Sequence, residues 1–429
     1  MKYIISTLGC KVNQYESQAM ETFLAEKGHV CACPGEQADA VIINTCAVTA
    51  ESGRKSRQMI RRLKEEHSGA VIAVCGCYSQ LSPSDVSAVG ADIVYGSGDR
   101  KGFIDAVEQA VLSKERRMAV DNPFCRRIFE ELPSGSVSGR TRAMLKIQDG
   151  CVNFCSYCII PYTRGRLRSL SLEKAAESTD ELRDRGFKEL VLTGIEIASY
   201  GVDIPGKPTL ADIVCTVAEH AGDMRIRLGS LEPTVVDELF CRRIRDTGKM
   251  CRHFHLSLQS GCDRTLKAMN RKYDTSVFYE KVGILREYFP NCGITADLIT
   301  GFPGESERDH QETMQFIEKC AFSAMHIFPY SRRPGTPADR MPDQCPNAVK
   351  AARAKEASGI AGKMKRAFLD SQIGSCLPVL FESTEGSGKW IGHSDNYVLV
   401  RAEGSSLRGE IRQVLVKERN GDILNGVID

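Results

Sequence analysis

Residues 143–328 repeat one pattern about six times: a short apolar run, a loop and an amphipathic stretch with helical periodicity. Strands and helices that alternate in this way predict a parallel sheet with helices packed against it. Six β/α units fall short of the eight that close a barrel, so we expect an incomplete parallel (β/α)6 barrel with functional residues at the carboxyl ends of its strands. The expected strands are Ala143–Ile147, Glu189–Leu192, Arg225–Leu228, His253–Leu258, Gly293–Ile299 and Ala324–Phe328.

Two smaller modules flank this repeat, and the expected fold class is α/β. The N-terminal module alternates short β-branched runs with amphipathic stretches, which predicts a small parallel α/β sheet. The C-terminal module follows a basic helix at Val349–Ala367 and contains short alternating runs, which predict a small antiparallel β-barrel. The predicted domains are residues 1–116, a linker at 117–140, the central barrel at 141–366 and the C-terminal barrel at 367–429.

The composition is that of an ordinary globular protein, apart from its cysteines. The 429 residues carry a net charge of +2, so any surface for a polyanionic partner must be local. The N-terminus does not resemble a signal peptide, and no run of about eighteen apolar residues offers a membrane span. We therefore expect the 18 cysteines to be thiols or metal ligands in the cytoplasm rather than disulfides.

Three cysteines follow the first barrel strand at the spacing C-x3-C-x2-C: Cys151, Cys155 and Cys158. Three thiolates can hold three irons of a [4Fe–4S] cluster, whereas ferredoxin-type clusters use four. The fourth iron is then open, as catalytic metal sites generally leave one position for a reactant. Zinc binding or unrelated buried thiols are the alternative interpretation of the same spacing.

A second set of three cysteines lies at predicted strand ends of the N-terminal module. Cys10, Cys46 and Cys77 each follow a strand, in turns with small or turn-favouring neighbours. Adjacent strand ends of a parallel sheet converge on one edge, so these cysteines should meet in space. Ordinary buried cysteines are the alternative. Cys75 competes with Cys77 for the third position, and we favour Cys77 because Cys75 still fits the strand pattern.

These motifs resemble those of the radical S-adenosylmethionine (SAM) enzymes and, among them, the methylthiotransferases. The cysteine loop at 151–158 is similar to the radical SAM motif. Segments 7–17 (TLGCKVNQYES), 44–48 (NTCAV) and 76–80 (GCYSQ) resemble the N-terminal domain of the methylthiotransferases. Segments 193–196 (TGIE), 256–261 (LSLQSG) and 297–305 (DLITGFPGE) look like the core motifs of that family. Segment 392–397 (GHSDNY) is similar to part of a TRAM domain, a small RNA-binding β-barrel.

The sequence Gly-Cys-Lys-Val-Asn at 9–13 resembles the branch that acts on N6-threonylcarbamoyladenosine in tRNA. The isopentenyladenosine branch usually carries Gly-Cys-Gln-Met-Asn there, and the ribosomal-protein branch Gly-Cys-x-Lys-Asn. The resemblance implies a transferase that adds a methylthio group to C2 of the modified adenosine at position 37, beside the anticodon. The alternatives are methylthiolation of isopentenyladenosine tRNA or of a ribosomal protein. An iron–sulfur redox or sensor protein is an alternative of another class, which would not explain the strand-end motifs of the barrel.

The same resemblance implies the cofactors, the partners and several site residues. Two [4Fe–4S] clusters are expected, one on each cysteine set, and SAM would bind the open iron of the barrel cluster and give a deoxyadenosyl radical on accepting one electron. The implied partners are the anticodon stem–loop of tRNA, a one-electron reductant such as flavodoxin or ferredoxin, and a sulfur donor. No association with a membrane is expected. The candidate SAM contacts are Tyr157, Glu196, Ser257, Gln259, Asp297 and Phe328. The alternative is an ordinary strand-end carboxylate for Glu196 and barrel packing for the others.

Two basic segments are candidate RNA contacts. The helix at 350–366 has six basic residues against one acid, Glu356. The arginines that follow the cysteine loop (Arg164, Arg166 and Arg168) are expected either to bind phosphates or to form a solvated face. Residues 374–429 contain six basic and eight acidic residues, although RNA-binding modules are normally basic. Either one face of that module is locally basic, or the preceding helix supplies the charge.

Overall fold

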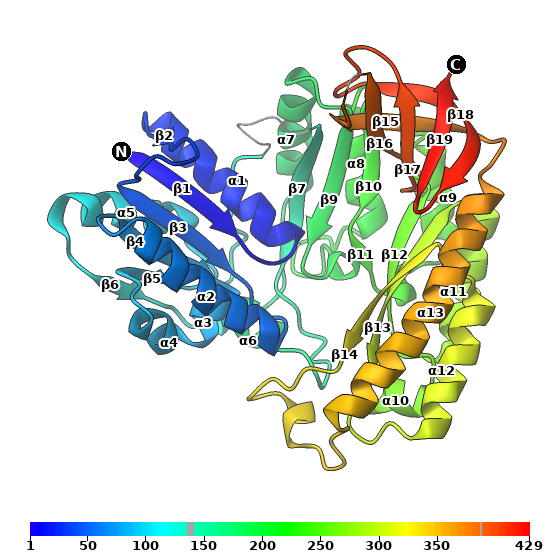
Figure 1. Ribbon diagram of the computed structural model, residues 1–429, viewed down its shortest axis with the longest axis horizontal. Coiled ribbons are helices and arrows are strands. Elements are labelled where there is room, and N and C mark those ends of the chain that lie inside the picture. The colour runs from blue at the N-terminus through cyan, green and yellow to red at the C-terminus, as the bar shows by residue number, and fades with distance from the viewer. Residues whose placement is uncertain (135–140, 387) are drawn as a thin grey trace.

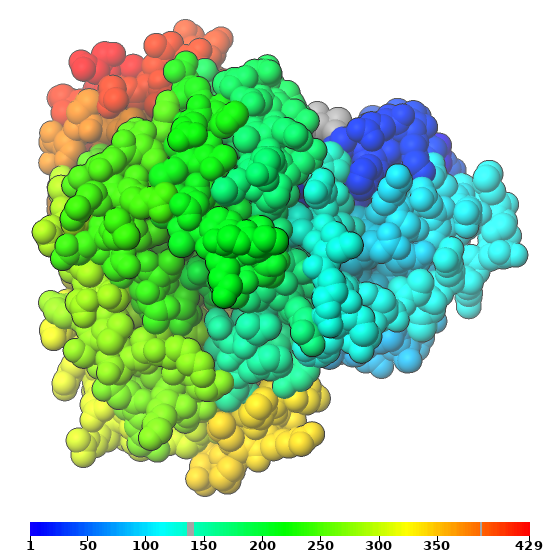
Figure 2. Space-filling view, turned by 180° about the vertical axis from the view of Figure 1, so that it is seen from behind, coloured from blue at the N-terminus to red at the C-terminus, as the bar shows by residue number. Residues whose placement is uncertain are grey.

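The computed structural model describes residues 1–134, 141–386 and 388–429. Its three modules are an N-terminal sheet, a central open barrel and a small C-terminal barrel (Figure 1). The N-terminal sheet lies beside the central barrel, and the C-terminal barrel sits at one end of it. Seen from behind, residues of the central barrel cover most of the face, with the N-terminal module on one side and the C-terminal module at the upper edge of the other side (Figure 2).

The N-terminal sheet has six parallel strands in the order β2-β1-β3-β4-β5-β6. Strands β3 and β4 are buried along their whole length because helices cover both faces of the sheet. Met20 and Phe103 pack on one face, and Ile60 and Val86 pack on the other. The elements are β1 Lys2–Thr7, α1 Lys11–Glu26, β2 Val30–Cys31, β3 Ala40–Thr45, α2 Ala50–Glu66, β4 Val71–Gly76, α3 Cys77–Leu81, α4 Pro83–Ala88, β5 Ile93–Tyr95, α5 Arg100–Ser113 and β6 Arg117–Ala119.

This sheet is the expected parallel α/β sheet, with two further strands at its edges. Strands β2 and β6 contain two and three residues, too few to show a periodic pattern in the sequence. Strand β6 pairs with β5, with Arg117 opposite Ile93. The sheet therefore extends into the segment 117–140 that the sequence predicts to be a linker.

The central module contains the six expected parallel strands, arranged as two sheets. One sheet has the order β10-β9-β7-β8 and the other the order β11-β12-β13-β14. The chain after β10 forms β11, which pairs with β12, so in the described residues the strand pairing between the two sheets consists of an isolated bridge between Ile226 of β10 and Met250, just before β12. The strands are β7 Arg142–Asp149, β8 Arg168–Ser169, β9 Glu189–Gly194, β10 Arg225–Leu228, β11 Ser230–Leu231, β12 His253–Gln259, β13 Gly293–Thr300 and β14 Ala324–Pro329.

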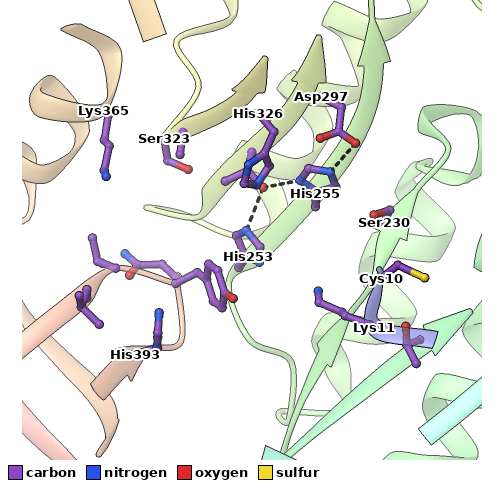
Figure 3. Close-up of a pocket in the computed structure, with 18 of the residues that line it drawn as sticks. Cys10, Lys11, Ser230, His253, His255, Asp297, Ser323, His326, Lys365 and His393 are labelled. Atoms are coloured by element: carbon purple, nitrogen blue, oxygen red, sulfur yellow. Dashed lines mark hydrogen bonds and ion pairs between the residues drawn. The ribbon is translucent and has the colours of Figure 1, made fainter. Parts of the chain in front are cut away.

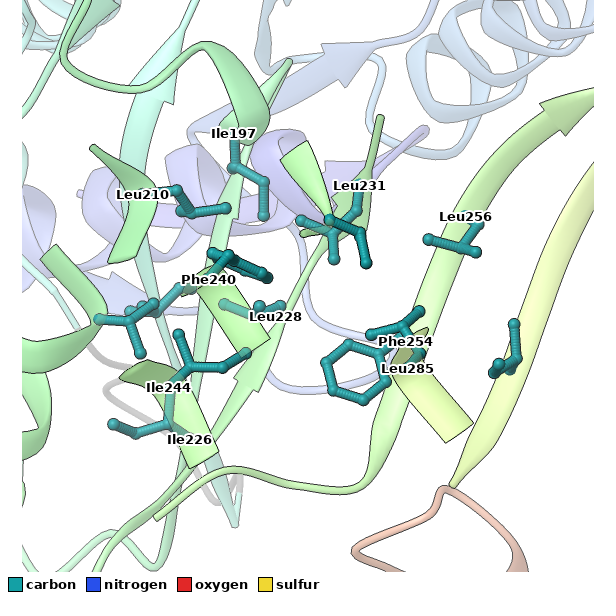
Figure 4. Packing of buried hydrophobic residues seen from close by; sticks show 14 of the residues in the cluster. Ile197, Leu210, Ile226, Leu228, Leu231, Phe240, Ile244, Phe254, Leu256 and Leu285 are labelled. Atoms are coloured by element: carbon teal, nitrogen blue, oxygen red, sulfur yellow. The ribbon is translucent and has the colours of Figure 1, made fainter. Parts of the chain in front are cut away.

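Helices cover the outer side of these strands. Phe254 and Leu256 of β12 are fully buried and pack with helix residues such as Phe240 and Leu285 (Figure 4). The intervening residues of β12 are only half-buried and face the interior of the open barrel. The helices are α6 Ile160–Arg164, α7 Leu172–Asp184, α8 Leu210–His220, α9 Glu238–Asp246, α10 Asp263–Ala268, α11 Thr275–Tyr288 and α12 Glu307–Cys320, with short 3₁₀ turns at Pro123–Cys125, Ile197–Ser199, Pro233–Val235 and Pro337–Arg340.

The long helix α13 (Asn347–Ser371) packs along β14 and leads into the C-terminal barrel. That barrel is closed, in the order β15-β16-β17-β19-β18. It matches the predicted antiparallel barrel except where β17 and β19 pair in parallel. Its strands are β15 Cys376–Thr384, β16 Lys389–Ser394, β17 Leu399–Glu403, β18 Ile411–Asn420 and β19 Ile423–Ile428. In the described ranges, no helix combines the length and the apolar character that crossing a membrane requires.

Candidate active site

Each cysteine of the N-terminal set follows a strand of the sheet. Cys10 directly precedes α1, Cys46 comes directly after β3, and Cys77 begins α3 after β4. Gly76 permits the last of these turns, because its φ is +106° and a Cβ there would lie 2.4 Å from the carbonyl oxygen of Thr45. Strands β1, β3 and β4 are neighbours in a parallel sheet, so their carboxyl ends bring the three cysteines to one edge.

The three thiols are close enough to influence one another's ionisation. Cys10 is exposed at the sheet edge, yet its pKa is raised to about 11: desolvation by the surrounding protein is the main cause, the guanidinium of Arg164 opposes it, and the thiols of Cys77 and Cys46 add smaller contributions. Cys75 instead packs in the apolar core on the other face of the sheet. The structure therefore gathers Cys10, Cys46 and Cys77 and leaves Cys75 apart from them.

Arg164 connects this cysteine edge to the central barrel. Its Nε lies 3.2 Å from Cys77 Sγ, and its Nη2 donates to Asn13 Oδ1 at 3.1 Å. The guanidinium also pairs with the carboxylate of Glu16, which binds Arg100 as well. These four polar side chains are all buried. The interpretation of Arg164 as a phosphate contact is therefore wrong, because its charge is neutralised inside the protein.

The other two arginines of that run differ from each other. Arg168 is buried, donates to the carbonyl oxygen of Arg164 at 3.1 Å and lies 3.5 Å from Asp149. Arg168 is thus also unable to reach a phosphate. Arg166 is exposed and remains a candidate for that role.

The second cysteine set lies in the loop between β7 and α6. The Cys158 N–H donates to the carbonyl oxygen of Cys155 at 2.9 Å, which closes a tight turn. Phe154 has a φ of +45°, a left-handed conformation that bends the loop between Cys151 and Cys155. Arg271 places its Nη1 3.2 Å from Cys155 Sγ. The loop thus holds its thiols at the carboxyl end of β7 with a cation beside them.

Both cysteine sets are more open than a site for a single ion. In the described part of the chain, the one group whose three ligand atoms all lie within 4.8 Å of one another is Cys262, Asp309 and Glu312. Neither three-cysteine set is that tight. Zinc, which needs its ligands at about 2.3 Å in a tetrahedron, would need closer sulfurs. Three thiolates are also one fewer than the four that ferredoxin-type clusters use, which leaves one iron of a [4Fe–4S] cluster without a protein ligand.

Glu196 has a carboxylate oxygen without a partner beside the barrel set. Its Oε2 accepts from Asn153 Nδ2 at 3.2 Å, whereas Oε1 is buried with no hydrogen bond in the described structure. Burial and the nearby carboxylate of Glu232 raise the pKa of Glu196 to about 7, against the opposite effect of Arg271. A buried, unsatisfied carboxylate oxygen of this kind fits a cationic ligand such as an ammonium group.

Three other candidate SAM contacts lie around the same loop. Tyr157 is half-buried and packs with the apolar cluster that contains Phe302. The carbonyl oxygen of Ser257 accepts from Arg271 Nη2 at 3.2 Å, which ties β12 to the residue beside Cys155. Gln259 lies at a bulge of β12 with a φ of +66°. Tyr157 is thus engaged in apolar packing, and the backbone of Ser257 is engaged in a hydrogen bond.

A cavity of about 920 Å³ opens where the three modules meet. Cys10 and Lys11 enter it from the N-terminal module, and His253 and His255 reach it from β12 (Figure 3). The C-terminal part of the chain closes another side of the cavity. Its residues there include Lys365, Phe368, His393, Asn396 and Tyr397.

The last two candidate SAM contacts, Asp297 and Phe328, line this cavity. Asp297 Oδ2 lies 3.2 Å from His255 Nε2 (Figure 3). Phe328 is 45% exposed, although it lies on a barrel strand. An aromatic ring in that position can cover a ligand in the cavity. Asp297 and Phe328 therefore lie apart from Glu196, which does not border the cavity.

Tyr397 forms the floor of the cavity. Its ring stacks with those of His253 and His393, at centroid distances of 4.5 and 4.8 Å. The guanidinium carbon of Arg227 lies 4.8 Å from the ring centroid, and Arg227 Nη2 donates to the carbonyl oxygen of Ser394 at 3.1 Å. The TRAM-like segment 392–397 is thus docked against the central barrel.

Sequence reasoning missed the cavity residues of β12 and the C-terminal loop. The polar residues of β12 recur at every second position from His253 to Gln259, and this alternation marks a strand with a polar inner face. That signal was present in the sequence. No local pattern predicts that Tyr397 meets His253, because the contact depends on how two modules dock.

Lys11 stands between this cavity and a second one of about 470 Å³. Lys11, Gln14 and Tyr397 line both cavities, so the two adjoin at these residues. In the described structure no carboxylate lies within 4.0 Å of Lys11 Nζ. The Lys11 side chain is exposed to the solvent of the cavity, and desolvation by the surrounding modules lowers its pKa; Tyr397 opposes this effect, and Arg227 acts with it.

Comparison with known families follows the same division of the chain. Residues 145–317 match the model of the radical SAM superfamily, and the open barrel with its three-cysteine loop defines a radical SAM enzyme. Residues 2–96 match the uncharacterized protein family UPF0004.

Curated relatives extend over nearly the whole chain. The threonylcarbamoyladenosine tRNA methylthiotransferases MtaB of Bacillus subtilis and Thermotoga maritima are each 37% identical, over 96% of this chain and 92% and 94% of their own lengths. The tRNA-2-methylthio-N(6)-dimethylallyladenosine synthase of Acetivibrio thermocellus is 34% identical over 89% of this chain and 80% of its own length. The chain therefore belongs to the radical SAM tRNA methylthiotransferases, and it is a transferase that uses iron–sulfur clusters and SAM.

Solved structures support the fold. The radical SAM methyltransferase TsrM of Kitasatospora setae superposes with a TM-score of 0.59 at 14% identity, over 79% of this chain and 77% of that chain. The cobalamin-dependent radical SAM enzyme OxsB superposes with a TM-score of 0.52 at 11% identity, over 79% of this chain and 54% of that chain. At these identities the likeness concerns the fold alone.

Proposed function

We propose that this chain adds a methylthio group to C2 of N6-threonylcarbamoyladenosine at position 37, beside the anticodon of tRNA. The central cavity carries the proposal, because Cys10 of one three-cysteine set lines it and strands neighbouring the other set form its wall. The names of the MtaB relatives support the choice of base. The adenosine would enter this cavity from the anticodon loop, splayed out of its stack.

The chemistry explains why two cysteine sets are needed. The C2–H bond of adenine is not acidic, so no side chain could remove its proton at neutral pH. When bound, two [4Fe–4S] clusters and SAM supply the radical chemistry that removes this hydrogen and the methylated sulfur that replaces it. Cys151, Cys155 and Cys158 would hold the cluster that binds SAM, and Cys10, Cys46 and Cys77 the cluster that carries the sulfur.

Residues of the barrel would position SAM. The free Oε1 of Glu196 would accept a hydrogen bond from the ammonium group of SAM, beside the open iron. Tyr157, Ser257 and Gln259 would border the adenine, ribose and carboxylate of the cofactor. Asp297 and Phe328 line the cavity, where they would face the side of SAM that is turned toward the substrate.

The partners follow from the same reaction. A one-electron reductant such as flavodoxin or ferredoxin would have to reduce the barrel cluster, and a sulfur donor would have to restore the sulfur consumed in each turnover. A chain that meets tRNA and such reductants would work in the cytoplasm. These three assignments are proposals that rest on the chemistry.

Substrate choice tests the proposal directly. The reconstituted enzyme would be given anticodon stem–loops that carry either threonylcarbamoyladenosine or isopentenyladenosine, and the nucleosides would be analysed by mass spectrometry. The expected product is 2-methylthio-threonylcarbamoyladenosine alone. The relatives named dimethylallyladenosine synthases make isopentenyladenosine the competing substrate. Methylthiolation of that base alone would overturn the proposal.

A further inference from the structure

We infer that Lys11 binds the carboxylate of the threonylcarbamoyl group and so sets the substrate specificity of the site; the inference rests on the proposed function. Lys11 follows Cys10 directly and projects into the central cavity (Figure 3). Threonylcarbamoyladenosine differs from other N6-modified adenosines in carrying a carboxylate on its N6 substituent. A site for it needs a cation that is free to pair.

The cavity contains one such cation in its described lining. The other charged side chains around the two adjoining cavities are paired. Lys365 lies 2.8 Å from Asp422, Arg142 lies 2.9 Å from Glu382, and Asp297 is paired with His255. Lys11 alone among them has no carboxylate within 4.0 Å in the described structure. Its ammonium therefore remains available for an anionic ligand.

The geometry of adenine fits this position. C2 and the N6 group lie on the same edge of the base, separated by N1 and C6. If C2 faces the cysteines of the N-terminal set, the N6 substituent must lie close to the same edge of the cavity. Lys11, the residue after Cys10, borders that edge, and with Tyr397 and Gln14 it lines the opening into the second cavity. The threonyl arm would extend through this opening past the Lys11 ammonium.

The test uses two synthetic anticodon stem–loops that are identical except at one group. One carries threonylcarbamoyladenosine, and the other carries its carboxamide, which keeps the shape and removes the charge. Binding to the reconstituted enzyme would be measured by fluorescence anisotropy. The wild type should bind the carboxylate RNA about tenfold to a hundredfold more tightly, since hydrogen bonds to charged groups are worth that much. Equal affinities in the wild type would overturn the inference without any variant.

Variants then assign the effect to one side chain. Lys11→Gln should reduce the ratio of the two affinities to near one, and Lys11→Arg should keep most of it. Lys365→Gln is the matched control, because it removes a paired cation from the same cavity and should leave the ratio unchanged. Iron and sulfide content would confirm that each variant keeps its clusters. If Lys11→Gln weakens both RNAs equally, Lys11 contacts a phosphate and the inference is wrong.

The outcome is separable from that of the proposed function. If the wild type fails to methylthiolate the carboxylate RNA, the proposed function fails whatever Lys11 does. If the wild type is active and Lys11→Gln keeps the full affinity ratio, only the role of Lys11 is overturned.

Discussion

At the scale of single residues, Arg164 joins parts of the chain that are far apart in sequence. Its backbone lies at the last residue of the barrel helix α6, and its guanidinium contacts Cys77, Asn13 and Glu16 of the N-terminal module. A buried guanidinium of this kind is stable only while its countercharge is present. The cysteine edge of the sheet is thereby fixed relative to the barrel by one buried network.

Glu16 provides a test of this network. Glu16→Gln should lower the free energy of unfolding by about 3–5 kcal/mol at neutral pH, because Arg164 and Arg100 lose their countercharge. Burial alone would raise the pKa of Glu16, but Arg100, Arg164 and Lys146 outweigh burial and hold it below the ordinary 4.5. Such a carboxylate stabilises the fold above its ordinary pKa and loses that contribution as the pH falls toward the folded value.

The difference between wild type and variant should therefore be constant above about pH 5 and shrink as the pH falls below it. Urea unfolding of the cluster-free protein, followed by circular dichroism at several pH values, would measure it. Glu177→Gln, on the exposed face of α7, is the control and should change stability by less than about 1 kcal/mol. A difference that grows on acidification would contradict the assignment.

At the scale of elements, the strand ends decide where the chemistry lies. One cysteine set stands at the ends of β1, β3 and β4, and the other follows β7. Each set has its own ligands at the strand ends of a separate sheet, although Ile159, next to Cys158, packs in the core of the N-terminal sheet. The two sites should therefore assemble independently.

Replacing each set should have a different result. Cys151→Ala/Cys155→Ala/Cys158→Ala should keep about half of the iron and sulfide of the wild type, because one three-cysteine set remains. It should lose reductive cleavage of SAM. Cys46→Ala should keep that cleavage, measured as deoxyadenosine by chromatography, and lose methylthiolation. Abolished cleavage in a folded Cys46→Ala protein that retains its barrel cluster would contradict separate roles.

Most of the helices and strands could be predicted from the sequence, but the contacts between modules could not. The major strands and helices were predictable because each has enough residues for a clear period, and the strand-end cysteines followed from parallel topology. The edge strands β2 and β6 are too short for a period. The burial of Arg164 and the stacking of Tyr397 depend on docking between modules, and a basic run looks the same in sequence whether it is solvated or neutralised by a distant carboxylate.

At the scale of the whole molecule, α13 carries exposed positive charge beside the cavity, whereas three of the six basic residues of the C-terminal barrel are paired within the chain. In the barrel, Arg401, Arg412 and Arg419 each pair with a carboxylate. On α13, Lys363 and Arg366 are exposed beside the cavity residue Lys365. Helix α13, which precedes the C-terminal barrel, is thus the better source of positive charge for binding phosphates beside the cavity.

Lys363→Gln/Arg366→Gln should weaken tRNA binding and reduce the slope of log affinity against log salt, by up to about one unit for each phosphate that is no longer neutralised. SAM cleavage without tRNA should be unchanged. Filter binding over a range of salt concentrations would measure the effect. The matched control is Arg242→Gln/Arg245→Gln on the outer helix α9, which should leave the slope unchanged. If the α13 variant binds tRNA normally at every salt concentration, this helix does not contact phosphates and only connects the two barrels.

The docking of Tyr397 against the barrel also has a consequence for how the enzyme is made. Tyr397 leaves the ribosome long after Cys10 and Lys11, although all three residues line the same cavity. A nascent chain can fold its N-terminal sheet and its barrel strands before the enclosure exists. The cavity is thus enclosed only after the C-terminal barrel has been synthesised, so a chain that stops before this barrel has the ligands of the site without the walls that shield a reactive intermediate from solvent.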